Sequence, residues 1–287
     1  TKLVSWAMRP IEAKSDRYDW PPPDPIWLPV DAARIQKVAV CICTRARPKM
    51  LERCLESLGS QLLPANVAMS IIIASNGPGH WTRTADVIER FKATSPFPVG
   101  FTHEEEPGIA AARNTACALA TFEGADWIAF IDDDEMADPD WIANLMAPEY
   151  LHVPVLMGAN VMEYPDPIPF WAPRPTGQGD ASQAAAKGNE GQLCKTAYTG
   201  NVRFSARLLA DGLRFDEGLG LMGGEDNEFF ARAHARGFQI RRTLRAITRE
   251  TAHPRRLTYA ALVYRSYWCA ASEYRRLAIT RGKAGAA

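Results

Sequence analysis

Short apolar runs alternate with segments of helical hydrophobic spacing through the first half of this 287-residue chain. The runs, each suited to a strand buried on both faces, lie at 38–43, 69–74, 99–101 and 127–131. The helical segments begin at Pro48, near residue 82 and near Pro107-Gly108. Strands separated by helices of this length predict a parallel, doubly wound α/β sheet flanked by helices. Because ligands bind such sheets beyond the carboxyl ends of the strands, the residues after each strand are the first candidates for a site.

The second half of the chain is less regular. Residues 163–195 are rich in Pro, Gly, Ala and Gln and predict a long mobile loop, in which Trp171 stands out as strongly apolar. A helix is expected over 225–236, ended by Gly237. A last helix over about 258–280 carries several tyrosines and arginines, and an aromatic-basic face of this kind suits packing or a membrane surface.

Prolines and composition mark the expected boundaries. The run Pro21-Pro22-Pro23-Asp24-Pro25 forbids helix, so residues 1–36 are expected to form an irregular leader. One main domain is expected over 37–255, and its regular half ends at about residue 137. The aromatic-basic helix then occupies the segment 256–287.

The charge balance and the cysteines exclude some classes of protein. Lys plus Arg and Asp plus Glu number 33 each, whereas a bulk nucleic-acid binder is usually basic. The 6 cysteines form no C-x-x-C pair and are too sparse for a disulfide framework, which indicates a reducing compartment. No apolar run approaches the roughly 18 residues of a membrane span, and the N-terminus has no secretory apolar region. We therefore expect no nucleic-acid partner and a cytoplasmic protein, peripheral to the inner face of a membrane if it contacts one.

Asp132-Asp133-Asp134 follows the expected strand at 127–131 directly. Adjacent carboxylates repel one another unless a cation neutralises them. In an extended continuation of the strand, Asp132 and Asp134 would point the same way and Asp133 the other way. Two carboxylates that converge at a sheet edge suit Mg²⁺ or Mn²⁺, which also takes substrate phosphates as ligands. A solvated acidic turn is the alternative interpretation.

A second acidic motif, Gly-Gly-Glu-Asp at 223–226, opens the helix expected at 225–236. Acids are common in a first helical turn because they complement the helix dipole. Asp226, however, shares a face with the apolar Phe229 and Phe230, so it is predicted to point inward. Partial burial would raise the pKa of Asp226 and suit it to act as a general base. The glycines would let the backbone approach a substrate closely.

Weaker signals accompany these two motifs. Arg113 falls in the first turns of the helix that begins near Gly108, where it could hold a diphosphate or simply be an exposed arginine. Thr44-Arg45 and Ser75-Asn76 follow the first two strands, where a nucleotide would bind. His253 is a candidate metal ligand, although a single histidine is more often structural.

Several motifs occur in a specific order between residues 36 and 265. They are V-A-V-C-I-C-T-R at 38–45, C-L-E-S-L at 54–58, G-I-A-A-A-R-N-T-A at 108–116, W-I-A-F-I-D-D-D-E at 127–135, P-D-W-I at 139–142, T-G-N-V at 199–202 and G-G-E-D-N-E-F-F at 223–230. The ordered set resembles the family 2 glycosyltransferases with a GT-A type fold, in particular the exopolysaccharide type that assembles succinoglycan.

The resemblance implies a role for each half of the main domain. Residues 37–137 would be the nucleotide-binding half, and 138–255 the acceptor half with the mobile loop at 163–195. The nucleotide-sugar site would comprise Thr44, Arg45, Ser75, Asn76, Arg113, Asp132 and Asp133. Many relatives have an aspartate that contacts the base where this chain has Ser75, so the identity of the nucleotide stays open.

The resemblance also implies an inverting transfer from a nucleotide-diphosphate sugar that depends on Mn²⁺ or Mg²⁺. By resemblance, Asp134 would hold the metal that bridges the diphosphate, Asp132 would contact the nucleotide near its ribose, Asp226 would be the catalytic base and Glu225 would hold the acceptor. From the residues themselves we add Asp132 and His253 as candidate metal ligands, and Gly224 and Trp171 as candidate acceptor-binding residues. A glycan or a lipid-linked glycan is the expected acceptor, and the latter would fit peripheral membrane contact.

Two other functions remain open on the sequence. A sugar-phosphate nucleotidyltransferase would use a similar sheet, but it should carry a Gly-rich loop after the first strand, where this chain has residues 43–47 with no glycine. A non-catalytic module that binds nucleotide or carbohydrate is the second alternative. A dehydrogenase is disfavoured, because no G-x-G-x-x-G follows a strand.

Overall fold

The computed structural model describes residues 24–29, 31, 34–79, 81–164, 171, 189–267, 270 and 274, without the side chains of 220–222. Most of the predicted leader and of the loop predicted at 163–195 lies outside the described residues. The ends of that loop belong to strands, because β6 runs to Glu163 and β7 begins at Leu193. The predicted last helix is described as helical over 259–267 and, beyond that, only at 270 and 274.

The first half of the chain forms the predicted parallel sheet. Its strands are β1 (Gln36–Thr44), β2 (Val67–Asn76), β3 (Val99–Glu104) and β4 (Trp127–Ile131). The helices between them are α1 (Pro48–Gly59), α2 (Thr82–Thr94) and α3 (Ile109–Phe122). β1 pairs in parallel with both β2 and β4, and β2 pairs in parallel with β3. The chain therefore moves outward from β1 to β3 and returns to β4 on the other side of β1, which creates a switch point between β1 and β4.

The second half of the chain extends the same sheet with mixed strand directions. Its strands are β5 (Glu135–Ala137), β6 (Val155–Glu163), β7 (Leu193–Cys194), β8 (Asn201–Ser205) and β9 (Ile240–Thr251). Its helical elements are α4 (Trp141–Leu145), η1 (Pro148–Tyr150), α6 (Arg207–Ala210), η3 (Glu217–Met222), α7 (Glu225–Ala235) and η4 (Pro254–Leu257). β8 runs antiparallel to β4 and β6, whereas β6 and β9 are parallel. The sheet order is β3-β2-β1-β4-β8-β6-β9-β5.

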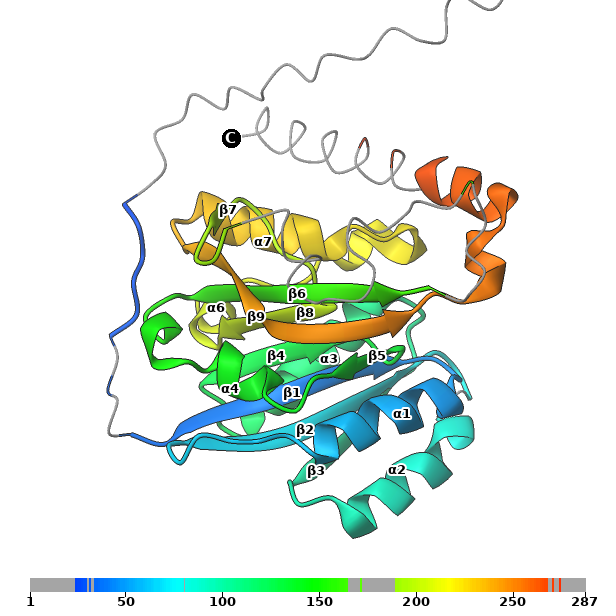
Figure 1. Ribbon diagram of the computed structural model, residues 1–287, viewed down its shortest axis with the longest axis horizontal. Coiled ribbons are helices and arrows are strands. Elements are labelled where there is room, and N and C mark those ends of the chain that lie inside the picture. The colour runs from blue at the N-terminus through cyan, green and yellow to red at the C-terminus, as the bar shows by residue number, and fades with distance from the viewer. Residues whose placement is uncertain are drawn as a thin grey trace, which may run out of the picture.

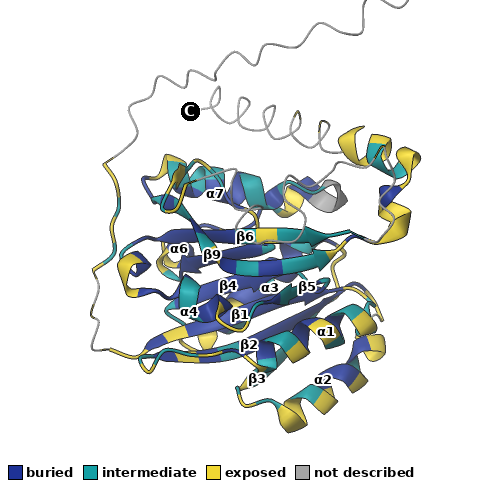
Figure 2. Ribbon diagram, in the orientation of Figure 1, coloured by how far each residue is buried: buried dark blue, intermediate teal, exposed yellow. Residues whose placement is uncertain are grey.

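Helices cover both faces of the sheet (Figure 1). Leu51 and Leu55 of α1 and Trp141 of α4 pack on one face, in a core that includes Val38 and Val40 of β1. A second core, on the opposite face, joins α3 and α7 to the alternate residues of β1 and to β8; it includes Phe204 and Phe230, whose rings meet edge to face 5.8 Å apart. The strands are the most buried part of the described chain (Figure 2), as their continuous apolar runs predict.

Helix boundaries follow the residues that the sequence singled out, with one exception. Pro48 is the first residue of α1, and Gly237, with a φ of 93°, stands just after the C-cap of α7. Leu62, which continues the helical spacing of Leu51, Leu55 and Leu58, lies beyond the end of α1 and is exposed. No helix among the described residues is long and apolar enough to span a membrane.

Candidate active site

The Asp132–Asp134 segment forms a turn beyond β4, so the expected extended continuation is wrong. The amide of Glu135 donates to the carbonyl oxygen of Asp132 over 3.1 Å, which closes the turn. Asp133 is fully buried: the hydroxyl of Thr44 donates to its carboxylate over 2.7 Å, and Arg47 pairs with it at 2.6 Å. Since Thr44 ends β1, these contacts cross the switch point and draw Asp133 inward. Asp132 and Asp134 keep more solvent exposure than Asp133.

Asp134 contacts two arginines that the sequence did not single out. Arg47 lies 3.2 Å from one of its oxygens, and Arg256 of η4 lies 3.1 Å from the same oxygen. Arg45, the residue predicted for the nucleotide site, is exposed. Between Arg45 and Arg47, Ala46 adopts a φ of 53°, in the left-handed region that non-glycine residues seldom enter. The chain bends at Arg45 and Ala46, between β1 and α1, and no local sequence pattern signals the left-handed residue.

The carboxylates of the turn have the chemistry that a hard divalent cation requires, because Asp132 and Asp134 supply oxygen ligands at the sheet edge. Within the described ranges, no three His, Cys, Asp or Glu side chains are arranged to hold a metal ion, so the ligand set of Asp132, Asp134 and His253 stays a prediction. His253 caps η4 in this structure, since its Nδ1 accepts a hydrogen bond from the amide of Arg255. The chemistry of the two aspartates fits the cation.

Arg113 links the first acidic motif to the second. It is 5% exposed, its guanidinium forms an ion pair with Glu225, and it lies 3.9 Å from Asp132. Burial opposes its charge, but Glu225 and Asp132 together raise the pKa of Arg113 above its ordinary value. Burial in turn raises the pKa of Asp132. The positive charge of Arg113 opposes this rise, whereas the negative charges of Asp134 and Asp226 add to it. Carboxylates from both motifs thus lie close enough to interact through one buried arginine.

The first turn of α7 buries two further acids beside the one that the helical pattern selected. Glu225 is 3% exposed and Glu228 is 5% exposed, whereas Asp226 has the partial burial that the sequence predicted. The start of the helix explains the burial of Glu225: Gly224, in the left-handed conformation with a φ of 89°, places Glu225 against Arg113. The amide of Thr199 donates to Asp226 over 3.5 Å, at the long limit for a hydrogen bond.

The polar residues at the ends of β1 and β2 are buried. Asn76 is bonded on both sides, because its amide donates to the carbonyl of Glu106 and its oxygen accepts from the amide of Gly108. The hydroxyl of Ser75 is buried without a hydrogen-bond partner in the described structure. Thr44, Ser75 and Asn76 therefore lie at one sheet edge, where Thr44 and Ser75 are register partners in β1 and β2.

Glu135, which sequence reasoning passed over, belongs to the same cluster. It is 5% exposed, and one carboxylate oxygen accepts a hydrogen bond from Asn160 of β6 over 2.7 Å. Burial, reinforced by Asp132, raises the pKa of Glu135 to about 9. Gly200 approaches it so closely that a Cβ there would lie 2.7 Å from the Glu135 carboxylate. The only sequence signal was its place directly after the triple aspartate.

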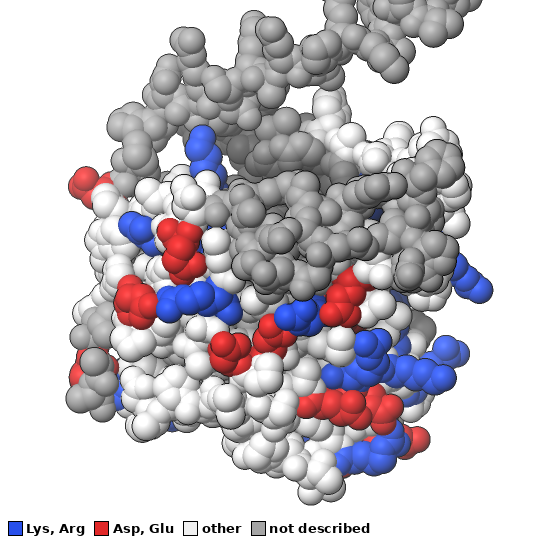
Figure 3. Space-filling model, in the orientation of Figure 1, with Lys and Arg blue, Asp and Glu red and all other residues white. Residues whose placement is uncertain are grey.

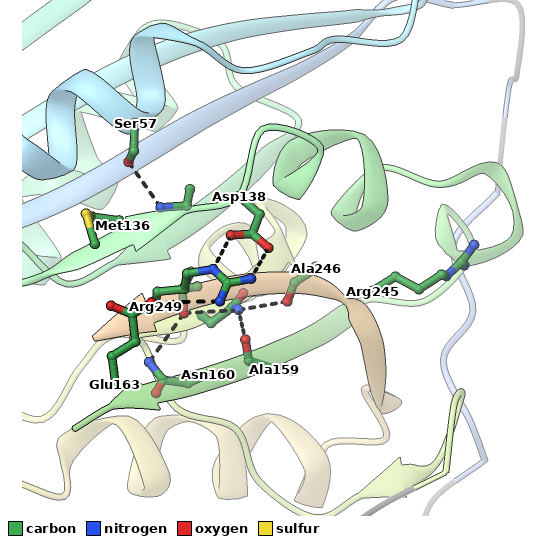
Figure 4. Close-up of polar contacts among 12 residues, drawn as sticks. Ser57, Met136, Asp138, Ala159, Asn160, Glu163, Arg245, Ala246 and Arg249 are labelled. Atoms are coloured by element: carbon green, nitrogen blue, oxygen red, sulfur yellow. Dashed lines mark hydrogen bonds and ion pairs between the residues drawn. The ribbon is translucent and has the colours of Figure 1, made fainter. Parts of the chain in front are cut away.

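Two contacts anchor the chain that leads away from the triple aspartate (Figure 4). Ser57 of α1 accepts a hydrogen bond from the amide of Ala137, and Asp138 forms a bidentate pair with Arg249 of β9 at 2.7 and 3.0 Å. In the same region Asn201, from the T-G-N-V motif, donates to the carbonyls of Ala159 and Ala246. The T-G-N-V asparagine is therefore a structural link between β8, β6 and β9.

Trp171 lies beside η4. Its indole nitrogen donates to the carbonyl of Leu257 over 2.9 Å, and its side chain remains half exposed. Leu257 directly follows Arg256, the residue that contacts Asp134. Trp171 is therefore near the Asp134 side of the site.

Comparison with known proteins identifies one family and one curated relative. Residues 39–197 match the profile of Glycosyl transferase family 2, which is more than half of the chain. The chain is also 30% identical over 234 residues to succinoglycan biosynthesis protein ExoM of Rhizobium meliloti (strain 1021), with 80% of this chain and 72% of that protein covered.

Solved structures share the fold at lower identity. One is S. aureus TarS 1-349 in complex with UDP-GlcNAc, with a TM-score of 0.56, 17% identity, and 76% of this chain and 59% of that chain covered. Another is mannosyltransferase PcManGT from Pyrobaculum calidifontis in complex with GDP-Man and Mn2+, with a TM-score of 0.55, 19% identity, and 83% and 62% covered. The chain thus spans less than two thirds of either solved chain, and likeness at this identity shows the fold alone.

Proposed function

The chain belongs to Glycosyl transferase family 2 and has the GT-A type fold, and from that premise we propose that it transfers a sugar from a nucleotide-diphosphate donor to a glycan hydroxyl with inversion at the anomeric carbon. Family membership removes the nucleotidyltransferase alternative. The relative from succinoglycan biosynthesis supports an acceptor in exopolysaccharide synthesis, either a glycan or a lipid-linked glycan.

One observation carries the assignment of the site. Arg113 lies between Asp132, beyond β4, and Glu225, at the start of α7, so the two acidic motifs share one edge of the sheet. That edge is the switch point at which open α/β sheets bind ligands. A donor bound over Asp132–Asp134 would therefore present its sugar toward the start of α7.

Departure of the nucleoside diphosphate requires neutralisation of growing negative charge. Asp132 and Asp134 would hold Mn²⁺ or Mg²⁺, which, when bound, stabilises that charge as a Lewis acid. One of the structural relatives, mannosyltransferase PcManGT, was solved with Mn2+, which supports a divalent ion. Arg113 carries a buried positive charge close to Asp132 and would orient the donor at the same edge.

Asp226 is the proposed general base. Its carboxylate is partly exposed and therefore accessible to an acceptor, while Glu225 beside it is occupied by Arg113. Asp226 would take the proton of the acceptor hydroxyl as that oxygen bonds to the anomeric carbon and the bond to the diphosphate breaks. A single displacement of this kind inverts the anomeric centre, as the family resemblance implies.

The C-terminal helix is the proposed contact with a membrane surface. Tyr259, Tyr267 and Tyr274 are largely exposed, and Arg265 is exposed among them. Amphipathic aromatic rings with neighbouring basic side chains suit the headgroup region of a membrane. Such contact would bring the site near a lipid-linked acceptor at the cytoplasmic face.

A donor panel tests the proposed function. Purified protein is incubated with individual nucleotide-sugars, with Mn²⁺ or with excess EDTA, and release of nucleoside diphosphate is measured beside donor binding. We expect release from one donor that EDTA abolishes and Asp134→Ala suppresses. Asp226→Asn should retain donor binding while transfer to acceptor falls by about 10²- to 10⁴-fold.

Asp211→Asn is the matched control, because Asp211 is an exposed acid paired with Arg207 on the surface. It should behave like the wild type. If the wild type binds no nucleotide-sugar and releases no diphosphate, the non-catalytic alternative replaces the proposed enzyme. If Asp226→Asn keeps full transfer activity, the base is another residue.

A further inference from the structure

Asp134 contacts two arginines that are far apart in the sequence. Arg47 precedes the first residue of α1, and Arg256 lies in η4, which follows β9. Both guanidinium groups contact the same carboxylate oxygen, at 3.2 and 3.1 Å. The proposed metal ligand is thus already neutralised by side chains of the protein.

Each arginine also has a second acidic partner. Arg47 pairs with the buried Asp133 at 2.6 Å, and Arg256 pairs with Glu250 at 2.7 Å. The arginine side chains are 40% and 51% exposed, whereas that of Asp134 is 15% exposed. A ligand from solution therefore reaches the guanidinium groups more readily than the carboxylate that they cover.

A small pocket beside Asp134 carries groups that bind phosphate. Its lining includes Arg53, Asp134, Met136 and Arg256. Guanidinium groups are the preferred partners of phosphate oxygens because they form paired, charge-assisted hydrogen bonds. Arg53 donates to the sulfur of Met136, so this arginine makes a weak contact that an anion would replace at small cost.

We infer that Arg47 and Arg256 bind the diphosphate of the donor and compete with the divalent cation for Asp134. This inference rests on the proposed function, because it takes Asp134 as the metal ligand and a nucleoside diphosphate as the donor group. A cation that binds Asp134 displaces guanidinium groups, and a diphosphate offers those groups new anionic partners. Cation and diphosphate therefore bind with positive coupling, each more tightly in the presence of the other.

Opposite effects of one substitution test the competition. Arg256→Gln removes a competing positive charge from Asp134, so Mn²⁺ alone should bind several-fold more tightly than to the wild type. The same substitution removes a donor to phosphate, so UDP or GDP in EDTA should bind about 10- to 100-fold more weakly. Mn²⁺ binding is followed by the loss of its free electron paramagnetic resonance signal, and nucleotide binding by calorimetry.

Three further variants make the result specific. Arg256→Lys keeps the charge but loses the paired geometry, so Mn²⁺ affinity should stay near that of the wild type while nucleotide affinity falls. Arg47→Gln is a second probe, although it leaves Asp133 without its cation and is assessed only if its circular dichroism matches the wild type. Arg245→Gln is the control, since Arg245 pairs with Glu149 and lies away from the ion pair of Asp138 and Arg249 (Figure 4).

The outcomes separate the inference from the function beneath it. Tighter Mn²⁺ binding together with weaker nucleotide binding in Arg256→Gln supports the inference. If that variant changes both affinities in the same direction, or neither, Arg256 is not a competing ligand and the inference is overturned. If the wild type itself binds neither UDP nor GDP, the proposed function fails and the inference falls with it.

Discussion

At the centre of the site, a buried arginine contacts a buried glutamate. Burial makes either charge costly without its partner. Arg113 and Glu225 are both nearly inaccessible, at 5% and 3% exposure. One nitrogen of Arg113 and one oxygen of Glu225 have no hydrogen-bond partner among the described atoms. Burial raises the pKa of Glu225, and Arg113 opposes that rise, so the charges of the two residues depend on each other.

Removal of one partner should therefore destabilise the fold more than removal of both. Glu225→Ala is expected to lower the free energy of unfolding by about 3 kcal/mol, because it leaves Arg113 buried and uncompensated. Arg113→Met combined with Glu225→Ala should recover much of that loss. Urea unfolding of the wild type, both single variants and the double variant measures the coupling. Additive losses would mean that the two side chains do not stabilise each other.

At the scale of elements, β6, β8 and β9 meet around one crowded position. Gly158 lies at the register shift between β6 and β9, beside Asn201 of β8. A Cβ at Gly158 would lie 2.3 Å from the side-chain oxygen of Asn201 and 2.5 Å from the backbone oxygen of Ala246. The irregular register thus depends on a residue without a side chain.

Gly158→Ala should destabilise the protein by about 3 kcal/mol, because a backbone carbonyl cannot move aside as a side chain can. Gly100→Ala is the matched control in β3. Its Cβ would meet the flexible carboxylate of Glu123 at 3.1 Å, so a loss below about 1 kcal/mol is expected. Thermal unfolding of both variants gives the comparison, and equal losses would contradict the argument from close approach.

Glu190 lies in the described segment that precedes β7, and it connects this segment to β9. Its carboxylate accepts hydrogen bonds from Tyr150, Thr243 and the amide of Leu244, at 2.6, 2.8 and 2.7 Å. Burial alone would raise the pKa of Glu190, but these bonds and Arg245 lower it below its ordinary value of 4.5.

Because the pKa of Glu190 is lowered in the fold, its ionised form stabilises the protein above about pH 4.5, and this contribution is lost as the pH falls below that value. At pH 7, Glu190→Gln should lower the free energy of unfolding by about 1 kcal/mol, since the carboxylate is partly exposed. The difference from the wild type should shrink as the pH is lowered to 3. A difference that is constant with pH would rule out a role for the charge.

At the scale of the whole molecule, positive and negative charges are equal in number and mixed on the surface, and the site is built from ion pairs at short range. Lys plus Arg equal Asp plus Glu at 33 each, and acidic and basic groups are interspersed on the face in Figure 3. Within the site, Asp132 and Asp226 lie near Arg113, and Asp134 is paired with Arg47 and Arg256. A cation and an anionic donor would give these groups new partners of opposite charge, so we expect the two ligands together to stabilise the fold.

Donor and metal together should raise the melting temperature. At ligand concentrations of about 100 times the dissociation constant, binding adds about 2.7 kcal/mol, which corresponds to a rise of about 5 °C or more in a protein of this size. The rise should disappear with EDTA and in Asp134→Ala, while Asp211→Asn retains it. A melting temperature that does not change with donor and Mn²⁺ would argue against a coupled site.

The hydrophobic pattern of the sequence was sufficient to predict the first half of the fold. β1, α1, β2, α2, β3, α3 and β4 lie where apolar runs and helical stripes predicted them. β1, β2 and β4 are mostly buried on both faces, and each helix is buried on one face, so their positions can be predicted from a few neighbouring residues. The run at 99–101 was also expected to be buried on both faces, but β3 is only half-buried because it lies at the end of the sheet. The second half could not be predicted in this way, because β8, β6 and β9 pair with partners distant in sequence and in mixed directions.

The sequence by itself determined which segments carry carboxylates to the sheet edge, because strand ends and helix starts are local features. Only the tertiary structure decided which charges meet. Arg256 and Asp134 are 122 residues apart, and Arg113 and Glu225 are 112 apart. The left-handed residues Ala46 and Gly224 aim Arg47 and Glu225, whereas a helical pattern had selected Asp226 as the inward acid. Partners of buried charges depend on left-handed residues that periodicity does not encode, so the roles of Asp226, Asp134 and Arg256 remain predictions for the experiments above.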